Sequence, residues 1–159
     1  MATKTNAVRL VQQAGIPCRE AFYEFDEQDL SGGHAAQAIG MPEEQVFKTL
    51  VARGEKTGIN VFCIPVCCEL DLKKAARAVG AKAVELLPVK EINAVTGYIR
   101  GGCTAIGMKK QYPTVIDQSA GEFDRIIISG GRIGSQIFLA PDDFIKATGG
   151  SYGDILAEM

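Results

Sequence analysis

Two kinds of hydrophobic pattern alternate along the chain, and together they indicate its elements. The apolar runs at 46–52 and 59–66 predict two strands joined by a turn at 53–58. The second run is apolar almost throughout, which is typical of a strand buried on both faces. Shorter runs predict strands at 20–25, 83–86, 113–116, 125–129 and 136–139.

Helical periodicity separates these strands. Apolar residues recur at helical spacing after Thr5 or Asn6, either of which can cap a helix that Gly15 ends. Further helical segments are expected at 34–39, in a first turn after Pro42, at 71–79, from Pro88 to near Gly97, and at 142–148 after Pro141. Because strands and helices interleave and several strands form antiparallel hairpins, the pattern predicts an α/β fold with a mixed sheet.

The predicted helix at 71–79 is amphipathic. Its apolar stripe consists of Leu72, Ala75, Ala76 and Val79. The opposite side carries Lys73, Lys74 and Arg77. This arrangement predicts one buried face and one basic, solvated face.

Composition places the chain among globular proteins of one domain. Its 159 residues suffice for a single core, and 47 % apolar with 23 % charged residues argues against disorder. The net charge of −2 disfavours a protein that coats long nucleic acid. Segment 48–110 nevertheless holds eleven basic and five acidic residues, a net +6, against −4 on either side. These lysines either decorate solvated faces or form one positive surface.

Cysteine and histidine usage argues against a disulfide framework and a metal site. The five cysteines are Cys18, Cys63, Cys67, Cys68 and Cys103, an odd number without zinc-knuckle spacing, and His34 is the one histidine. We therefore expect reduced thiols, no cofactor and no metal. The first residues lack an apolar signal core, and no apolar run is long enough to cross a membrane. A cytoplasmic location is expected.

Two places suggest anion binding. Lys48 lies within a predicted strand, where it is either an exposed lysine or a cation held in a partly apolar cleft. The glycine-rich segment 101–107 is either a plain turn or a loop whose backbone N–H groups bind an oxyanion, and Lys109 and Lys110 follow it.

Other candidate positions have simpler alternatives. Ser129 leads into a glycine turn with Arg132 at its tip, which either contacts phosphate or faces water. Asp142 and Asp143 suit the first turn of a helix. The chain offers no nucleophile–histidine–acid triad, because His34 sits after two glycines in a segment expected to be exposed. An enzyme of this kind suits an activated ester, which needs mainly positioning and oxyanion stabilisation.

The ordered motifs resemble one known family. They are Phe47-Lys48-Thr49-Leu50, then 70–76, Lys90-Glu91, Thr96-Gly97-Tyr98-Ile99 with Gly101-Gly102, Ile106-Gly107 with Lys109-Lys110, 113–117, Ser129-Gly130-Gly131 and 140–143. In this order and spacing the chain resembles the YbaK/EbsC family of bacterial aminoacyl-tRNA deacylases, which are related to the editing insertion of prolyl-tRNA synthetase. The resemblance implies a single editing domain over residues 1–159, with a partly barrel-like mixed sheet flanked by helices.

The resemblance also implies an activity, the hydrolysis of mischarged Cys-tRNA(Pro). Prolyl-tRNA synthetase cannot fully reject cysteine, so a second site must edit the product. Members of this family are thought to use no protein nucleophile: the substrate's own thiol attacks its ester and leaves as a cyclic thiolactone. Alternatives are a deacylase for alanine or serine, a tRNA- or synthetase-binding module without catalysis, and a thiol redox protein.

Site residues follow from the same resemblance. Lys48 matches the functional lysine, and Gly101 and Gly102 match the loop that holds the aminoacyl carbonyl. Tyr23, Ser129 and Asp143 match positions around the pocket. The other residues expected at the substrate are Thr49, Cys103 and Thr104, and those expected at the tRNA are Lys73, Lys74, Lys109, Lys110 and Arg132.

One position departs from the family pattern. Ala105 stands where the loop commonly has proline, whose ring would fix φ and remove a donor, so a looser loop with altered amino-acid selectivity is expected. The expected partners are the acceptor end of tRNA(Pro) and prolyl-tRNA synthetase, with no membrane and no DNA.

Overall fold

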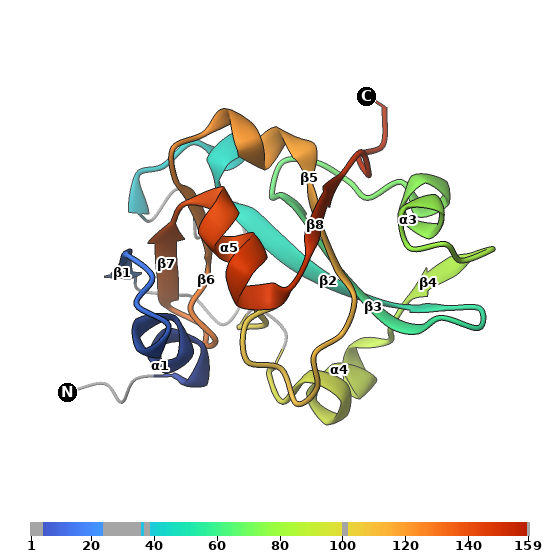
Figure 1. Ribbon diagram of the computed structural model, residues 1–159, viewed down its shortest axis with the longest axis horizontal. Coiled ribbons are helices and arrows are strands. Elements are labelled where there is room, and N and C mark those ends of the chain that lie inside the picture. The colour runs from blue at the N-terminus through green and yellow to red at the C-terminus, as the bar shows by residue number, and fades with distance from the viewer. Residues whose placement is uncertain (1–4, 24–35, 37–38, 100–101, 159) are drawn as a thin grey trace.

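Residues 5–23, 36, 39–99 and 102–158 are described by a computed structural model of the chain (Figure 1). The first helix, α1 (Asn6–Gln13), begins as the sequence predicts: the Thr5 hydroxyl accepts the Val8 N–H at 3.1 Å. Strand β1 (Cys18–Phe22) follows and starts two residues earlier than expected, while residues 24 and 25 lie outside the described part.

The larger sheet has five strands in the order β4-β2-β3-β5-β8. Their bounds are β2 (Phe47–Gly54), β3 (Gly58–Pro65), β4 (Val84–Leu86), β5 (Thr114–Asp117) and β8 (Ser151–Gly153). β2 is antiparallel to β3 and β4, whereas β3, β5 and β8 run parallel, which confirms the mixed sheet. Residues 60–65 of β3 are all buried, as the continuous apolar run predicts.

A second sheet of three antiparallel strands, β1-β7-β6, lies beside the first. It adds β6 (Ile126–Ser129) and β7 (Ser135–Leu139). A single parallel bridge between Val46 and Ile127 links it to the entrance of β2. The expected partly barrel-like sheet is thus two sheets joined at one corner, and they do not close into a barrel within the described residues.

The helices cover the outer sides of these sheets. They are α3 (Leu72–Ala78), α4 (Val89–Thr96) and α5 (Pro141–Thr148). The short 3-10 helices are η1 (Glu43–Gln45) and η2 (Gln118–Glu122). η1 replaces the helical turn expected after Pro42, and η2 and β8 were not predicted. The expected helix at 34–39, which includes His34, falls largely outside the described residues.

Three apolar clusters form the core. The main one lies between the two sheets and α1 and α5, and includes Val8, Phe47, Ile128 and Phe144. A second packs α3 on the larger sheet through Ala75 and Ala76. The third covers the outer face where the sheets join, and consists of Ala36, Val46, Ile127 and Phe138. The predicted stripe on α3 needs one correction: Leu72, at the first position of the helix, is 44 % exposed rather than buried.

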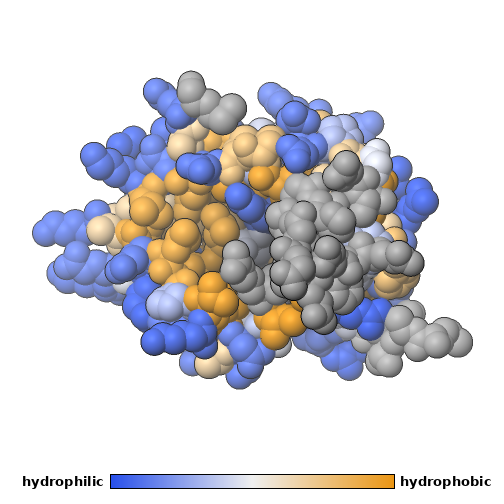
Figure 2. Space-filling view, turned by 180° about the vertical axis from the view of Figure 1, so that it is seen from behind, coloured by the Kyte–Doolittle hydropathy of each residue, from blue (hydrophilic) through white to orange (hydrophobic). Residues whose placement is uncertain are grey.

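The back of the molecule carries an apolar surface (Figure 2). Apolar side chains gather there over the half that holds α3, β4 and the start of α4. Exposed large apolar residues on these elements are Leu72, Leu86 and Val89. No helix in the described part of the chain is long and apolar enough to cross a membrane.

Candidate functional site

Lys48 and Ser129 lie on the same face of the sheet junction. Val46 and Ile127 are aligned in parallel, and continuing that alignment by two residues puts Lys48 and Ser129 on the same face of adjacent strands. Ser129 is paired in turn with Gln136 of β7, which is buried at 5 % exposure. A cation, a hydroxyl and an amide therefore line one face, immediately beyond the apolar cluster of Val46 and Ile127.

Lys48 is half-buried on this face. Burial raises the pKa of the Cys68 thiol, in the turn after β3, to about 11, and the charge of Lys48 opposes this rise only weakly. The role of Lys48 in binding an anion stays a prediction.

Gly102 packs directly on the hairpin turn between β6 and β7. A Cβ atom at this position would lie 2.7 Å from Arg132 Cα and 2.9 Å from Ile133 N, closer than side-chain carbons approach backbone atoms. The Gly102 N–H donates to Ile99 O at 3.0 Å, so this N–H is already engaged inside the loop. Gly102 therefore packs closely against this turn. Gly101, the other glycine expected to hold the aminoacyl carbonyl, lies outside the described residues.

The glycine loop is held from both ends. The buried Tyr98 hydroxyl donates to Ile106 O at 2.6 Å, and burial raises the pKa of Tyr98 to about 12. Thr104 is buried, and Ala105 packs against the main core. These contacts anchor the loop even though alanine occupies the position where proline was expected.

Tyr23 lies at the same end of the small sheet. It directly follows β1, and its N–H donates to Gly134 O at 2.9 Å. Gly134 belongs to the hairpin turn on which Gly102 packs. The structure thus brings together four of the expected site residues at this end: Tyr23, Lys48, Gly102 and Ser129.

Thr49 and Cys103 lie on the other side of β2. Thr49 is paired with Cys63, and the Thr49 Oγ1 and Cys63 Sγ atoms are 3.8 Å apart. Burial raises the pKa of Cys63 to about 12 and that of Cys103 to about 11. Since the thiolate is the nucleophile, these protonated thiols are unsuited to attack an ester near neutral pH.

Three further expected residues lie away from this end. Asp143 is in the first turn of α5, which follows the opposite end of β7. Lys73 and Lys74 are on α3, across the molecule from the small sheet (Figure 1). Lys74 Nζ donates to Leu156 O at 2.9 Å and lies 3.4 Å from Asp154, so its ammonium holds the C-terminal segment.

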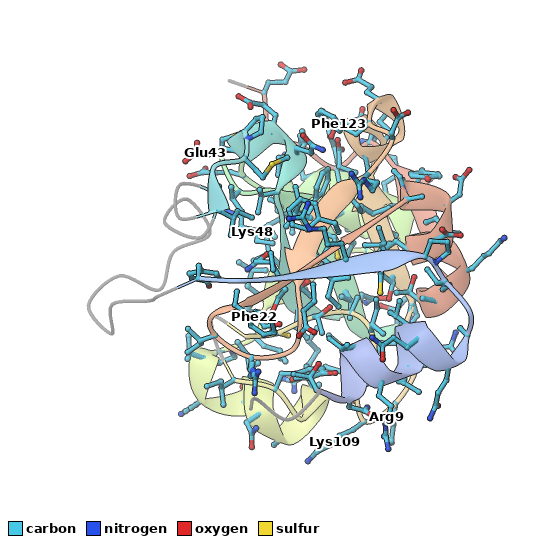
Figure 3. The ribbon with its side chains drawn as sticks, turned by 90° about the vertical axis from the view of Figure 1, so that its left-hand side faces the viewer. Arg9, Phe22, Glu43, Lys48, Lys109 and Phe123 are labelled. Carbon is cyan, nitrogen blue, oxygen red and sulfur yellow. The ribbon has the colours of Figure 1, made fainter. Side chains whose placement is uncertain are left out.

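The remaining basic residues flank the glycine loop. Lys109 lies over the end of α4, where its Cγ is 3.4 Å from the position of a Cβ on Gly97, and it extends away from the body (Figure 3). Lys110 is exposed. The Arg132 guanidinium carbon lies 5.9 Å from the centroid of the Phe22 ring. Figure 3 shows Lys48 above strand β1 and Phe22 below it.

Two residues at this end of the sheet, Gln136 and Phe22, were not among the expected site residues. Both lie in predicted strands, where the hydrophobic pattern alone gives them no functional role. Only the pairing of β7 with β1 and β6 places them at this end of the small sheet. Within the described residues no group of three or more histidine, cysteine or acidic side chains is arranged to hold a metal ion.

The chain is similar to known proteins in sequence and in fold. EbsC of Enterococcus faecalis, a candidate Cys-tRNA(Pro)/Cys-tRNA(Cys) deacylase, is 47 % identical over 152 residues, which cover 96 % of this chain and 93 % of EbsC. The crystal structure of a candidate trans-editing enzyme for prolyl-tRNA synthetase superposes with a TM-score of 0.80 at 25 % identity, covering 98 % of this chain and 100 % of that one.

A hypothetical protein, APE2540, has the same fold, with a TM-score of 0.87 at 21 % identity over 96 % of this chain and 100 % of its own. Residues 32–147, most of the chain, match the model of one family. On this match and on the identity to EbsC, the chain belongs to the family of aminoacyl-tRNA editing domains.

Proposed function

We propose that this protein is a trans-acting deacylase that removes cysteine from mischarged tRNA(Pro). EbsC, which is similar over nearly the whole chain, carries the same substrate in its name. The observation that carries the proposal is that Lys48 shares a face with Ser129 and Gln136, at the end of the sheet where the glycine loop packs on the β6–β7 turn. This is a surface for an anion and an ester.

The chemistry assigns the nucleophile to the substrate. The cysteinyl sulfur forms a bond to its own ester carbonyl carbon, the bond from that carbon to the ribose oxygen breaks, and the thiol proton ends on the ribose oxygen. The products are tRNA and a cyclic thiolactone, which water opens to free cysteine. The high pKa values of Cys63, Cys68 and Cys103 support this route, because these protein thiols stay protonated near neutral pH.

Lys48 has the electrostatic role in this scheme. Negative charge develops on the carbonyl oxygen as sulfur attacks, and a half-buried ammonium stabilises it more strongly than a fully hydrated one. The Ser129 hydroxyl and the Gln136 amide are placed to orient the aminoacyl group on the same face. The reaction needs positioning more than acid–base chemistry, which suits a site without a described histidine.

Recognition of the tRNA is the second part of the proposal. The protein contacts the acceptor end, and prolyl-tRNA synthetase supplies the identity of the tRNA. The candidate trans-editing enzyme with the same fold is named for that synthetase, which supports this division of labour.

A panel of charged tRNAs tests the proposal. Purified protein is incubated with tRNA(Pro) carrying cysteine, alanine, serine or proline, with and without prolyl-tRNA synthetase, and released amino acid is measured. We expect release of cysteine, and loss of at least about a hundredfold in rate for Lys48→Ala, within the range measured when one oxyanion-stabilising group is removed. Lys82→Ala is the matched control, since Lys82 is an exposed lysine beyond α3.

Blocking the substrate thiol tests the nucleophile. Cysteinyl-tRNA(Pro) whose thiol has been alkylated should resist hydrolysis. Unchanged hydrolysis of that substrate would rule out the thiolactone route, and wild-type activity in Lys48→Ala would remove the role given to Lys48.

A further inference from the structure

The most exposed aromatic ring on the described surface of the small sheet belongs to Phe22. Its exposure is 58 %, although phenylalanine usually buries most of its ring. Phe22 is the last residue of β1 and is paired with Ser135, so its ring lies on the face of the small sheet opposite to Ser129 and Gln136, at the end that holds the β6–β7 turn. Core packing does not account for a ring in this position.

Arg132 fixes one side of this ring. Its guanidinium carbon lies 5.9 Å from the ring centroid, within the range of a cation–π contact. Arg132 is also the residue on which Gly102 packs, with 2.7 Å between Arg132 Cα and a Cβ built on Gly102. The exposed ring, the guanidinium and the glycine loop therefore all contact the β6–β7 turn through Arg132. Arg132 itself is half-buried.

We propose that Phe22 and Arg132 form a stacking platform for a nucleobase, the terminal base of the acceptor strand, beside the turn on which the glycine loop packs. This inference rests on the proposed function. An exposed aromatic ring beside a cation is the combination that single-stranded nucleic acids use: the base stacks on the ring and the cation attracts the phosphate backbone.

The platform holds the terminal nucleotide at the turn on which the glycine loop packs. The Arg132 backbone contacts Gly102, and the Arg132 guanidinium extends from the same residue to the Phe22 ring. The platform also explains how a site with few charges binds an acceptor end without reading the rest of the tRNA. Stacking is tolerant of base identity, so the platform positions the end and leaves selection of the tRNA to other contacts.

A double-mutant cycle with uncharged RNA tests the platform directly. The probes are two acceptor minihelices that end in CCA, one intact and one with an abasic terminal nucleotide, and the affinity of each is measured by fluorescence anisotropy. For the wild-type protein we expect the abasic probe to bind roughly 5- to 150-fold more weakly, the range for one stacked base. For Phe22→Leu, which keeps an apolar side chain and loses the ring, we expect the two probes to bind equally.

Further variants separate stacking from structure. Phe22→Trp should retain the preference for the intact probe, and Arg132→Lys, which keeps the charge but loses the planar group, should reduce it. Tyr152→Leu removes an exposed aromatic ring on β8 and is the matched control. Thermal denaturation of each variant shows that the fold is intact.

The outcomes also distinguish this inference from the proposed function. Equal binding of the two probes to the wild-type protein, or a preference that survives in Phe22→Leu, overturns the platform even if cysteinyl-tRNA(Pro) is hydrolysed. A wild-type protein that prefers the intact probe but hydrolyses no charged tRNA supports the platform and contradicts the deacylase.

Discussion

Replacing Gly102 by alanine is the sharpest test of the arrangement at the glycine loop. The new Cβ would lie 2.7 Å from Arg132 Cα, 2.9 Å from Arg132 C and 2.9 Å from Ile133 N. All three are backbone atoms of a hairpin turn, so no flexible side chain can move aside. The loop must separate from the turn, and overpacking of this kind costs about 1–3 kcal/mol.

The cost converts to a measurable shift. For a domain of this size each kcal/mol lowers the melting temperature by about 2–4 °C, so Gly102→Ala should melt about 2–12 °C below the wild type in a thermal denaturation followed by circular dichroism. Deacylation of cysteinyl-tRNA(Pro) should fall at least about tenfold in kcat/KM, because a misplacement of the loop by a few tenths of an ångström or more disturbs the reacting geometry.

Gly121→Ala is the matched control for this experiment. Gly121 lies in η2, is exposed, and a Cβ there meets no atom within 4 Å. It should leave both stability and activity unchanged. If Gly102→Ala behaved like Gly121→Ala in both assays, the close packing of the glycine loop on the β6–β7 turn would be refuted.

Three further predictions concern stability. Tyr98→Phe removes the donor to a buried carbonyl and should cost about 1–3 kcal/mol in urea unfolding, whereas an unchanged midpoint would mean that the loop is held elsewhere. Lys74→Ala frees the C-terminal segment and should cost about 1 kcal/mol, while Lys73→Ala should cost nothing; equal effects would contradict the assignment. Burial raises the pKa of Cys63 from 9.0 to about 12, so the folded state binds the thiol proton more tightly than the unfolded state does. The contribution of this proton to the free energy of unfolding is therefore complete below pH 9 and declines as the pH rises toward 12. Urea unfolding between pH 8 and pH 10.5 should show a shallower decline for Cys63→Ala than for the wild type, and parallel curves would count against the effect.

The sequence predicted the strands well where hydrophobic pattern and turn chemistry agree. β2, β3 and the hairpin of β6 and β7 have apolar runs bounded by glycine turns, and their bounds came within two residues. β8 was not predicted because Ser151–Gly153 is short and carries no apolar alternation. It becomes a strand only by pairing with β5. Local pattern holds no information about such a partner.

The candidate site also combines what the sequence predicted with what only the pairing of strands shows. Lys48 and Ser129 were found through motifs, yet their adjacency depends on the bridge between Val46 and Ile127, which joins segments about eighty residues apart. Thr49 was expected at the substrate; because neighbours in a strand point to opposite faces, it lies on the face of β2 opposite to Lys48, where it is paired with Cys63. Motif order therefore identified the strands of the site, and only the register decided which side chains meet.

The distribution of charge bears on how the protein holds RNA. The net +6 of segment 48–110 left open one positive surface, but folding separates its lysines: Lys48 lies at the sheet junction, Lys74 is bound to the C-terminal segment, and Lys109 extends from the end of α4. If the acceptor end meets only Lys48 and Arg132, the logarithm of its affinity should fall with the logarithm of salt concentration with a slope of about −1.4, since each phosphate contact on a single strand contributes about −0.7. Contacts with the four further expected lysines as well would give a slope of about −4. A measured slope close to the smaller value would mean that stacking and apolar contact, rather than charge, provide most of the affinity, which suits a protein of net charge −2 that must release its tRNA after one brief encounter.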